Sequence, residues 1–246
     1  MPGPPEPGPV AIVTALREEF RTIRSRAPGL RFDRENPEIG SVGRAKVIVA
    51  LTGDGPERAG KGAAALCDAV RPSALIGAGV AGALSRELSI GQILAARAIR
   101  DASGEAPPPD EGLLARALAQ GATAGTFVTV DRPITNASRR AALSLCVDGR
   151  IPAAVDMESG AWARAAAARG IPYLMLRAVS DAAEEELPEY LSRCVGEDGR
   201  VRRQTVVAHA LGRPATIPAL LRMRGRVLDG TARLSRFLEE LLGSSS

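Results

Sequence analysis

Residues 153–181 read AAVDMESGAWARAAAARGIPYLMLRAVSD, and the pattern of this segment is the clearest indication of the fold. An apolar run at 153–157 is followed by an alanine-rich segment at 159–169 and by a second apolar run at 173–179. Short runs that are apolar almost throughout are typical of strands buried on both faces of a sheet. The alanine-rich segment between them is long enough for a helix. The stretch therefore predicts a strand–helix–strand unit.

The same alternation extends in both directions along the chain. Further strands are predicted at residues 10–16, 46–52, 74–76, 92–99 and 126–130. Helices are predicted from Arg17, at 57–70, at 113–120 and after residues 131–138. We therefore expect residues 1–246 to form one α/β domain in three layers, with a central mixed, mainly parallel sheet between two layers of helices.

Residues 201–246 are expected to be a helical, arginine-rich part of the same domain. Leucines and a phenylalanine recur there at helical spacing, at positions 234, 237, 238, 241 and 242. Eight arginines stand against three acidic residues in this part, a net charge of +5, whereas the whole chain carries +4. A helix packed on the core is the simpler interpretation, and a basic amphipathic surface that contacts a membrane is the alternative.

The composition disfavours several kinds of active site and several classes of binding partner. His209 is the only histidine, and the three cysteines, Cys67, Cys146 and Cys194, are far apart. These counts disfavour a Ser-His-Asp triad, a metal site and a disulfide scaffold, so we expect neither a metal nor a cofactor. The basic residues lack interleaved aromatic residues, so no nucleic acid is expected as a partner. No signal peptide or membrane span is recognisable, which predicts a cytoplasmic protein.

Gly77, Gly79 and Gly82 form a GxGxxG pattern after the predicted strand at 74–76. This pattern could belong to a dinucleotide-binding fold. However, only eight residues separate Gly82 from Gly91, and the next predicted strand starts immediately afterwards. A crossover with a helix needs about 10–12 residues or more. We therefore interpret the glycines as positions where a ligand approaches the backbone at the end of a strand.

Acidic residues stand at the ends of three predicted strands, where α/β sheets place their ligands. Glu19 follows the first strand, Glu158 follows the strand at 153–157, and Asp181 follows the strand at 173–179. A carboxyl group at the end of a buried strand is partly desolvated, so it can hold a proton and serve as a general acid. The residues alone predict a carboxylate site in an α/β pocket.

Four motifs give the chain a resemblance to the superfamily of purine nucleoside phosphorylases and methylthioadenosine/S-adenosylhomocysteine nucleosidases. They are TALREEF at 14–20, GAGVAGAL at 77–84, VDMES at 155–159 and RAVSD at 177–181. The resemblance implies a nucleoside phosphorylase-like fold. It also implies that Asp181 protonates the departing purine, that Glu158 holds the ribose hydroxyls, that Met157 packs on the sugar, and that Glu19 activates water.

The chain also departs from that superfamily at two places. The glycine motif has Val80 where its relatives carry Ser or Thr near the sugar or phosphate, so Val80, Ala81 and Gly82 are expected to line the sugar side. The motif VDRPI has Pro133 where nucleosidases have a stacking aromatic, but it keeps Ile134 for the base. The glycine motif has no arginine and TALREEF has only Arg17, which favours water over phosphate as acceptor. Inorganic phosphate would be a co-substrate only in a phosphorylase.

VDRPITNASRR, VDMES and the segment at 199–221 most resemble the branch of hopanoid-associated phosphorylases, also described as adenosylhopane nucleosidases. This resemblance implies release of adenine from adenosylhopane, a lipid-linked adenine nucleoside, by a homo-oligomer, with a dimer favoured. The basic C-terminal part would then contact the inner face of the membrane. The alternatives are phosphorolysis of the same bond, cleavage of methylthioadenosine or S-adenosylhomocysteine, and a nucleoside-binding protein without catalysis.

Overall fold

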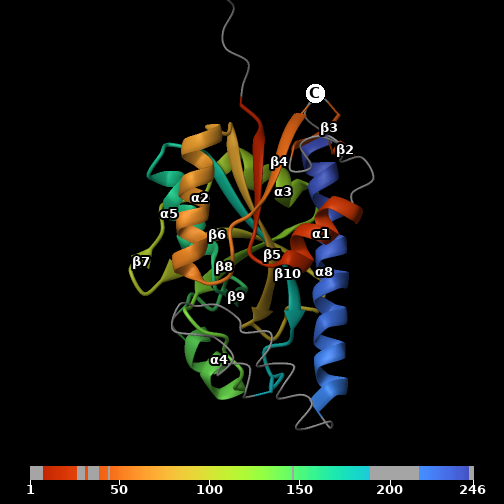
Figure 1. Ribbon diagram of the computed structural model, residues 1–246. Helices are drawn as coiled ribbons and strands as arrows, with labels where there is room; N and C mark the ends of the chain where they lie inside the picture. The colour runs from red at the N-terminus through yellow and green to blue at the C-terminus, as the bar shows by residue number, and fades with distance from the viewer. Residues whose placement is uncertain are drawn as a thin grey trace, which may run out of the picture.

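The computed structural model describes residues 8–26, 31–32, 39–43, 45–145, 147–188 and 216–243. Cys146, Cys194 and His209 lie outside the described residues, as do residues 201–215 of the basic C-terminal part. Figure 1 shows strands in the middle of the molecule with helices on either side.

The described strands form one sheet of ten members. Their bounds are β1 (Val10–Thr14), β2 (Arg31–Phe32), β3 (Ile39–Val42), β4 (Ala45–Leu51), β5 (Ala74–Ala83), β6 (Ile93–Asp101), β7 (Gly104–Glu105), β8 (Thr123–Thr129), β9 (Ala153–Asp156) and β10 (Tyr173–Asp181). The order is β10-β6-β8-β9-β5-β1-β4-β3-β2, with β7 beside β6. The sheet is mixed, as predicted: β1 is parallel to β4 and β5, and β10 is parallel to β5, whereas β9 is antiparallel to β5.

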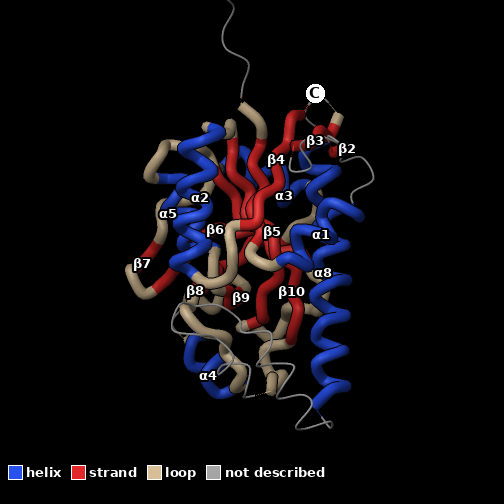
Figure 2. The backbone as a smooth tube through the Cα atoms, in the orientation of Figure 1, coloured by secondary structure: helices blue, strands red, loops and turns tan. Residues whose placement is uncertain are grey.

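Strand β10 pairs with β5 as well as with β6. Strands β5, β9, β8, β6 and β10 therefore form a closed ring, and β1, β4, β3 and β2 extend from it as an open sheet. The red strands in Figure 2 lie between the blue helices in this arrangement.

Six helices surround the sheet in the described part of the chain. They are α1 (Arg17–Arg26), α2 (Pro56–Val70), α3 (Glu111–Ala119), α4 (Ala137–Ser144), α5 (Ser159–Ala167) and α8 (Ile217–Gly243). Local sequence explains where they begin: Pro56 opens α2, where its missing N–H has no partner in any case, and Asp110 caps α3 by accepting a hydrogen bond from the N–H of Leu113 at 2.8 Å.

Two apolar clusters place the helices on opposite faces of the sheet. On one face, Ala63 of α2 and Trp162 of α5 pack against Leu75 and Met175. On the other, α1, α3 and α8 pack on the strands, with Ile23, Leu114, Leu234 and Leu238 in one cluster with Ile12 and Leu174. This arrangement confirms the three predicted layers, and Figure 1 shows α2 and α5 opposite α1 and α8.

The predicted leucine pattern at 234–242 lies on α8, whose buried face carries Leu234, Phe237, Leu238, Leu241 and Leu242. The N-terminal half of α8 runs past the arrowheads of β5 and β10 (Figure 1). None of the described helices combines the length and the apolar character that crossing a membrane requires.

The prediction that the glycine run follows a short strand was wrong. Strand β5 continues through the whole run to Ala83, and no helix lies between it and β6. The antiparallel pairs of β3 with β2 and with β4 were also not predicted. The missing helix after Gly82 agrees with the argument against a dinucleotide-binding site.

Candidate active site

One pocket, of about 210 Å³, lies where β5 and β10 end. All eight candidate residues line it: Glu19, Val80, Ala81, Gly82, Ile134, Met157, Glu158 and Asp181. They come from five segments of the chain, so the fold brings together what the sequence separates by more than 160 positions. Pocket residues without a predicted binding role include Asp54, Arg140, Asp156, Ser180 and Leu187.

Two glycines of β5, Gly79 and Gly82, leave space for charged side chains that pack directly against the strand. A Cβ at Gly79 would be 2.7 Å from Nη1 of Arg177 and 2.8 Å from Oε1 of Glu19. A Cβ at Gly82 would be 2.7 Å from Oδ2 of Asp181. Any side chain at these positions would displace the groups that surround the pocket.

Glu19 lies in the first turn of α1 and turns back towards the strands. The backbone N–H groups of Ala15 and Leu16 donate to its Oε2 at 3.2 and 2.9 Å, and the N–H of Val80 donates to Oε1 at 3.1 Å. Burial raises the pKa of Glu19 above its ordinary value, although Arg177 and the three N–H groups oppose this shift. The result is a carboxylate with a fixed orientation and increased basicity at the pocket wall.

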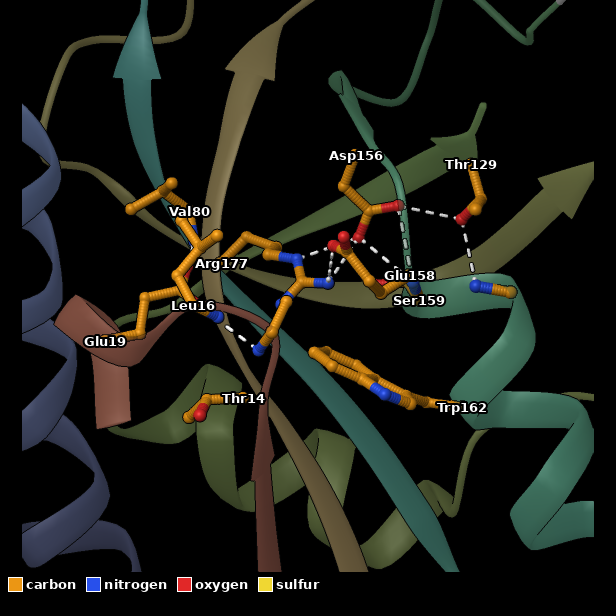
Figure 3. Close-up of polar contacts among 12 residues, drawn as sticks. Thr14, Leu16, Glu19, Val80, Thr129, Asp156, Glu158, Ser159, Trp162 and Arg177 are labelled. Carbon is orange, nitrogen blue, oxygen red and sulfur yellow. Dashed lines mark hydrogen bonds and ion pairs between the residues drawn. The ribbon is translucent and has the colours of Figure 1, made fainter. Parts of the chain in front are cut away.

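Arg177 is a buried cation at the centre of three carboxylates (Figure 3). Its Nη2 is 2.6 Å from Oδ2 of Asp156 and 3.8 Å from Oε2 of Glu158, and its Nε donates to Asp156 at 2.8 Å. The guanidinium also lies 4.8 Å from the ring centre of Trp162. Burial alone would lower the pKa of Arg177, but Asp156, Glu158 and Glu19 together raise it. Arg177 therefore remains charged and holds the carboxylates in place.

Asp156 is fixed from several sides. Thr129 donates its hydroxyl to Oδ1 at 2.8 Å, and the N–H of Ser159 donates to both carboxylate oxygens at 3.3–3.4 Å. The hydroxyl of Thr129 in turn accepts a hydrogen bond from the N–H of Gly160 at 2.9 Å. These contacts fasten the end of β9 to the start of α5, and Glu158 and Met157 lie between those two elements.

The carboxyl group of Glu158 also has a raised pKa. Burial raises its pKa to about 8, and the negative charges of Asp156 and Glu19 add to this shift. Arg177 and the N–H of Gly55, which donates to Oε1 at 3.1 Å, oppose it. Glu158 can therefore hold a proton at neutral pH and can both donate and accept hydrogen bonds.

Asp181 ends β10 directly beside Gly82 of β5. Ser180 donates its hydroxyl to Oδ1 at 2.5 Å, and Nη1 of Arg140 lies 2.5 Å from Oδ2. Both carboxylate oxygens are therefore contacted by donors of the protein. Sequence reasoning did not identify Arg140 as a pocket residue.

The remaining candidate residues form the apolar parts of the wall. Ile134 and Pro133 lie in the loop before α4, and Met157 lies beside Glu158. Val80 lies near Gly230 of α8, where an added Cβ would be 3.6 Å from Cγ1 of Val80. Among the described residues, no group of three or more histidine, cysteine, aspartate or glutamate side chains is arranged to hold a metal ion.

Comparison with known proteins gives consistent results. The sequence model of the phosphorylase superfamily matches residues 9–211. A 5'-methylthioadenosine/S-adenosylhomocysteine nucleosidase from Exiguobacterium sp. is 26% identical over 207 residues, which cover 72% of this chain and 86% of that protein. A similar relative from Haemophilus ducreyi is 26% identical over 205 residues, with the same coverage.

Solved structures resemble the whole chain. A nucleosidase of the same name from Colwellia psychrerythraea, in complex with adenine, has a TM-score of 0.72 at 18% identity, over 97% of this chain and 96% of that one. The futalosine hydrolase of Helicobacter pylori has a TM-score of 0.70 at 19% identity, over 95% and 97% of the two chains. Together the fold and the pocket define a nucleoside phosphorylase-like α/β enzyme, as predicted. The chain belongs to the phosphorylase superfamily and is an enzyme of the nucleosidase and nucleoside phosphorylase class.

Proposed function

We propose that this enzyme releases adenine from an adenine nucleoside by hydrolysis of the N-glycosidic bond. The observation that carries the proposal is the convergence of Glu19, Glu158 and Asp181 on one pocket. N-glycosidic cleavage passes through a sugar cation, so it needs one acid for the leaving base, one base for water, and negative charge nearby.

Asp181 is the general acid and Glu19 is the general base. As the bond between the sugar C1' and the purine breaks, its electron pair goes to the purine, and a proton from Asp181 neutralises the departing ring. A water oxygen bonds to C1' and gives its proton to Glu19. The raised pKa of Glu19 suits this second step, because a more basic carboxylate accepts the proton of water more readily.

The other candidate residues bind the substrate. Glu158 holds the ribose hydroxyls, and Met157 packs on the sugar. Ile134 contacts the base, whereas Val80, Ala81 and Gly82 line the sugar side of the pocket. A partly protonated Glu158 can accept from one hydroxyl and donate to another, which supports this role.

The charge distribution of the pocket supports water rather than phosphate as the acceptor. Its described lining contains five acidic residues and a single arginine, Arg140. Arg140 is in contact with Asp181 and two carbonyl oxygens, and Arg177 is held by Asp156 and Glu158. Both guanidinium groups are therefore already paired with carboxylates of the protein. A pocket of this kind repels phosphate and stabilises a sugar cation.

Among adenine nucleosides, the resemblance of VDRPITNASRR to the hopanoid-associated branch favours adenosylhopane. The position of the apolar Val80 near Gly230 of α8 is compatible with an apolar group on the 5' side of the sugar. Near its N-terminus α8 exposes Ile217 and Leu221, the latter at 61%, together with Arg222 and Arg224. This surface suits contact with anionic lipid headgroups during transfer of a lipid substrate. We further expect a homodimer.

The decisive experiment measures adenine release from adenosylhopane, methylthioadenosine, S-adenosylhomocysteine and an adenosine-like futalosine analogue. Each substrate is tested with and without inorganic phosphate. The proposal predicts release without phosphate, a free sugar as product, and the highest kcat/KM for adenosylhopane. A strict requirement for phosphate would overturn the proposal that water is the acceptor. Preference for methylthioadenosine would assign the enzyme to the function of its curated relatives, and tight binding without release would leave a nucleoside-binding protein.

A further inference from the structure

Arg140 is a buried cation whose contacts connect two walls of the pocket. It lies on α4, and its side chain is 2% exposed. Nε and Nη2 donate to the carbonyl oxygen of Ile134 at 3.2 and 3.0 Å. Nη1 donates to the carbonyl oxygen of Ala182 at 2.9 Å and lies 2.5 Å from Oδ2 of Asp181. One planar group therefore joins the loop around Ile134 to the end of β10.

We propose that Arg140 is a positioning residue that orients the Asp181 carboxyl group towards the base and stabilises the carboxylate that forms when Asp181 gives up its proton. This inference rests on the proposed role of Asp181 as general acid. It gives a part in the reaction to Arg140, the last residue of VDRPITNASRR, to which the resemblance assigns no role.

The geometry explains how Arg140 would act through Asp181. Ser180 contacts Oδ1 and Arg140 contacts Oδ2, so the plane of the carboxyl group is fixed from both sides. A proton donor becomes an anion as it reacts, and a guanidinium 2.5 Å from that anion stabilises it in a site of low dielectric. The guanidinium is itself held by the two carbonyl oxygens, so it needs no rearrangement during the step.

The contact with Ile134 gives Arg140 a second role, which is to hold the loop around Ile134 in place. The loop around Ile134 is the proposed base-binding wall, and Arg140 holds it against the strand end that carries Asp181. A second backbone contact supports this connection, because the N–H of Leu187 donates to the carbonyl oxygen of Thr135 at 2.9 Å. Arg140 would therefore help to place the purine relative to Asp181.

The test compares two leaving groups in Arg140→Met, Arg140→Lys and the matched control Arg139→Met. Arg139 is the exposed neighbour on the same helix. Adenine needs a proton to leave, whereas the 4-nitrophenolate of a 4-nitrophenyl riboside does not. We expect Arg140→Met to lower kcat for the adenine nucleoside about 100-fold, within the range of general acid catalysis, with less than a 3-fold change for the nitrophenyl riboside. Arg140→Lys recovers part of the loss, and Arg139→Met behaves as the wild type.

A double-mutant cycle with Asp181→Asn separates this inference from the proposed function. If Arg140 acts through Asp181, Arg140→Met causes no further loss in the Asp181→Asn background. Equal losses for both leaving groups, or an additional loss in that background, would refute the positioning role while the proposed function stands. Full activity of Asp181→Asn would instead refute the proposed function itself. Because the comparison of leaving groups uses one protein preparation, a partly unfolded variant does not produce the selective effect.

Discussion

Replacing Glu158 by glutamine tests the charge balance of the pocket through stability rather than activity. Glutamine has nearly the same shape, and its amide oxygen can accept the hydrogen bond from the N–H of Gly55. In the wild type, burial raises the pKa of Glu158 from 4.5 to about 8. Between these values the folded protein keeps a proton that the unfolded chain has released. The contribution of Glu158 to stability is therefore fully present below pH 4.5 and is lost as the pH rises through 8.

The size of the effect follows from the span of the shift. A shift of one pKa unit corresponds to about 1.4 kcal/mol, so a span of about 3.5 units gives a loss of up to about 5 kcal/mol at alkaline pH. Glu158→Gln carries no charge at any pH and escapes this loss. Its free energy of unfolding should therefore match the wild type near pH 5 and exceed it by several kcal/mol at pH 9.

Urea denaturation from pH 5 to pH 9 measures the difference. Glu87→Gln, in an exposed loop, is the matched control for the loss of one carboxylate. Parallel stability curves for the wild type and Glu158→Gln would show that Glu158 is ionised in the folded protein across this range. That result would mean that Arg177 and the N–H of Gly55 outweigh the effect of burial on this carboxyl group.

Three further predictions concern the glycines, the base and the surface of α8. Gly82→Ala places a Cβ 2.7 Å from Oδ2 of Asp181. It should therefore lower the free energy of unfolding, measured by urea denaturation, by about 1–3 kcal/mol and abolish adenine release. The control is Gly225→Ala in α8, where an added Cβ meets open space, and its free energy of unfolding should rise by about 0.4–1 kcal/mol. Equal effects of the two variants would contradict the steric argument. Glu19→Gln should remove hydrolysis but leave adenine binding within about 2-fold by calorimetry, and retained turnover would assign water activation to another group. Arg222→Glu with Arg224→Glu should abolish sedimentation with phosphatidylglycerol vesicles while activity on methylthioadenosine persists; wild-type protein that ignores anionic vesicles would refute membrane contact.

The sequence located the strands and the pocket more accurately than the contacts within the pocket. The apolar runs predicted the β1, β4, β6, β8, β9 and β10 strands because burial on both faces leaves a continuous apolar pattern. The run at 74–83 was misjudged because glycines have no side chain to report burial. Only the structure shows that Arg177, Glu19 and Asp181 occupy the space above them.

The direction of β9 was equally hidden in the sequence. β9 is parallel to β8 but antiparallel to β5, with Val155 opposite Gly82. Its end therefore reaches back along β5 towards Gly79, and this return places Glu158 beside Arg177. The alternation of strands and helices predicted acidic residues at strand ends. It did not predict that Glu158 follows a strand that is antiparallel to β5.

Two arginines, Arg177 and Arg140, differ in how far the sequence pattern indicated their contacts. Arg177 interrupts a buried apolar strand, and a buried cation requires carboxylate partners, so Asp156 and Glu158 could have been proposed from that interruption. Arg140 gave no such signal, because it stands on a short polar helix and reaches Asp181 only through the packing of α4 against the end of β10. The roles assigned to the eight candidate residues, the hopanoid substrate and the dimer stay predictions.

The most direct test of the central claim is adenine release by Asp181→Asn in phosphate-free buffer, measured beside the wild type and Glu19→Gln. We expect the wild type to release adenine and a free sugar, and both variants to fold, to bind adenine and to lose at least 100-fold in kcat. Release by Asp181→Asn at the wild-type rate would contradict the claim that carboxylates at this pocket cleave the glycosidic bond.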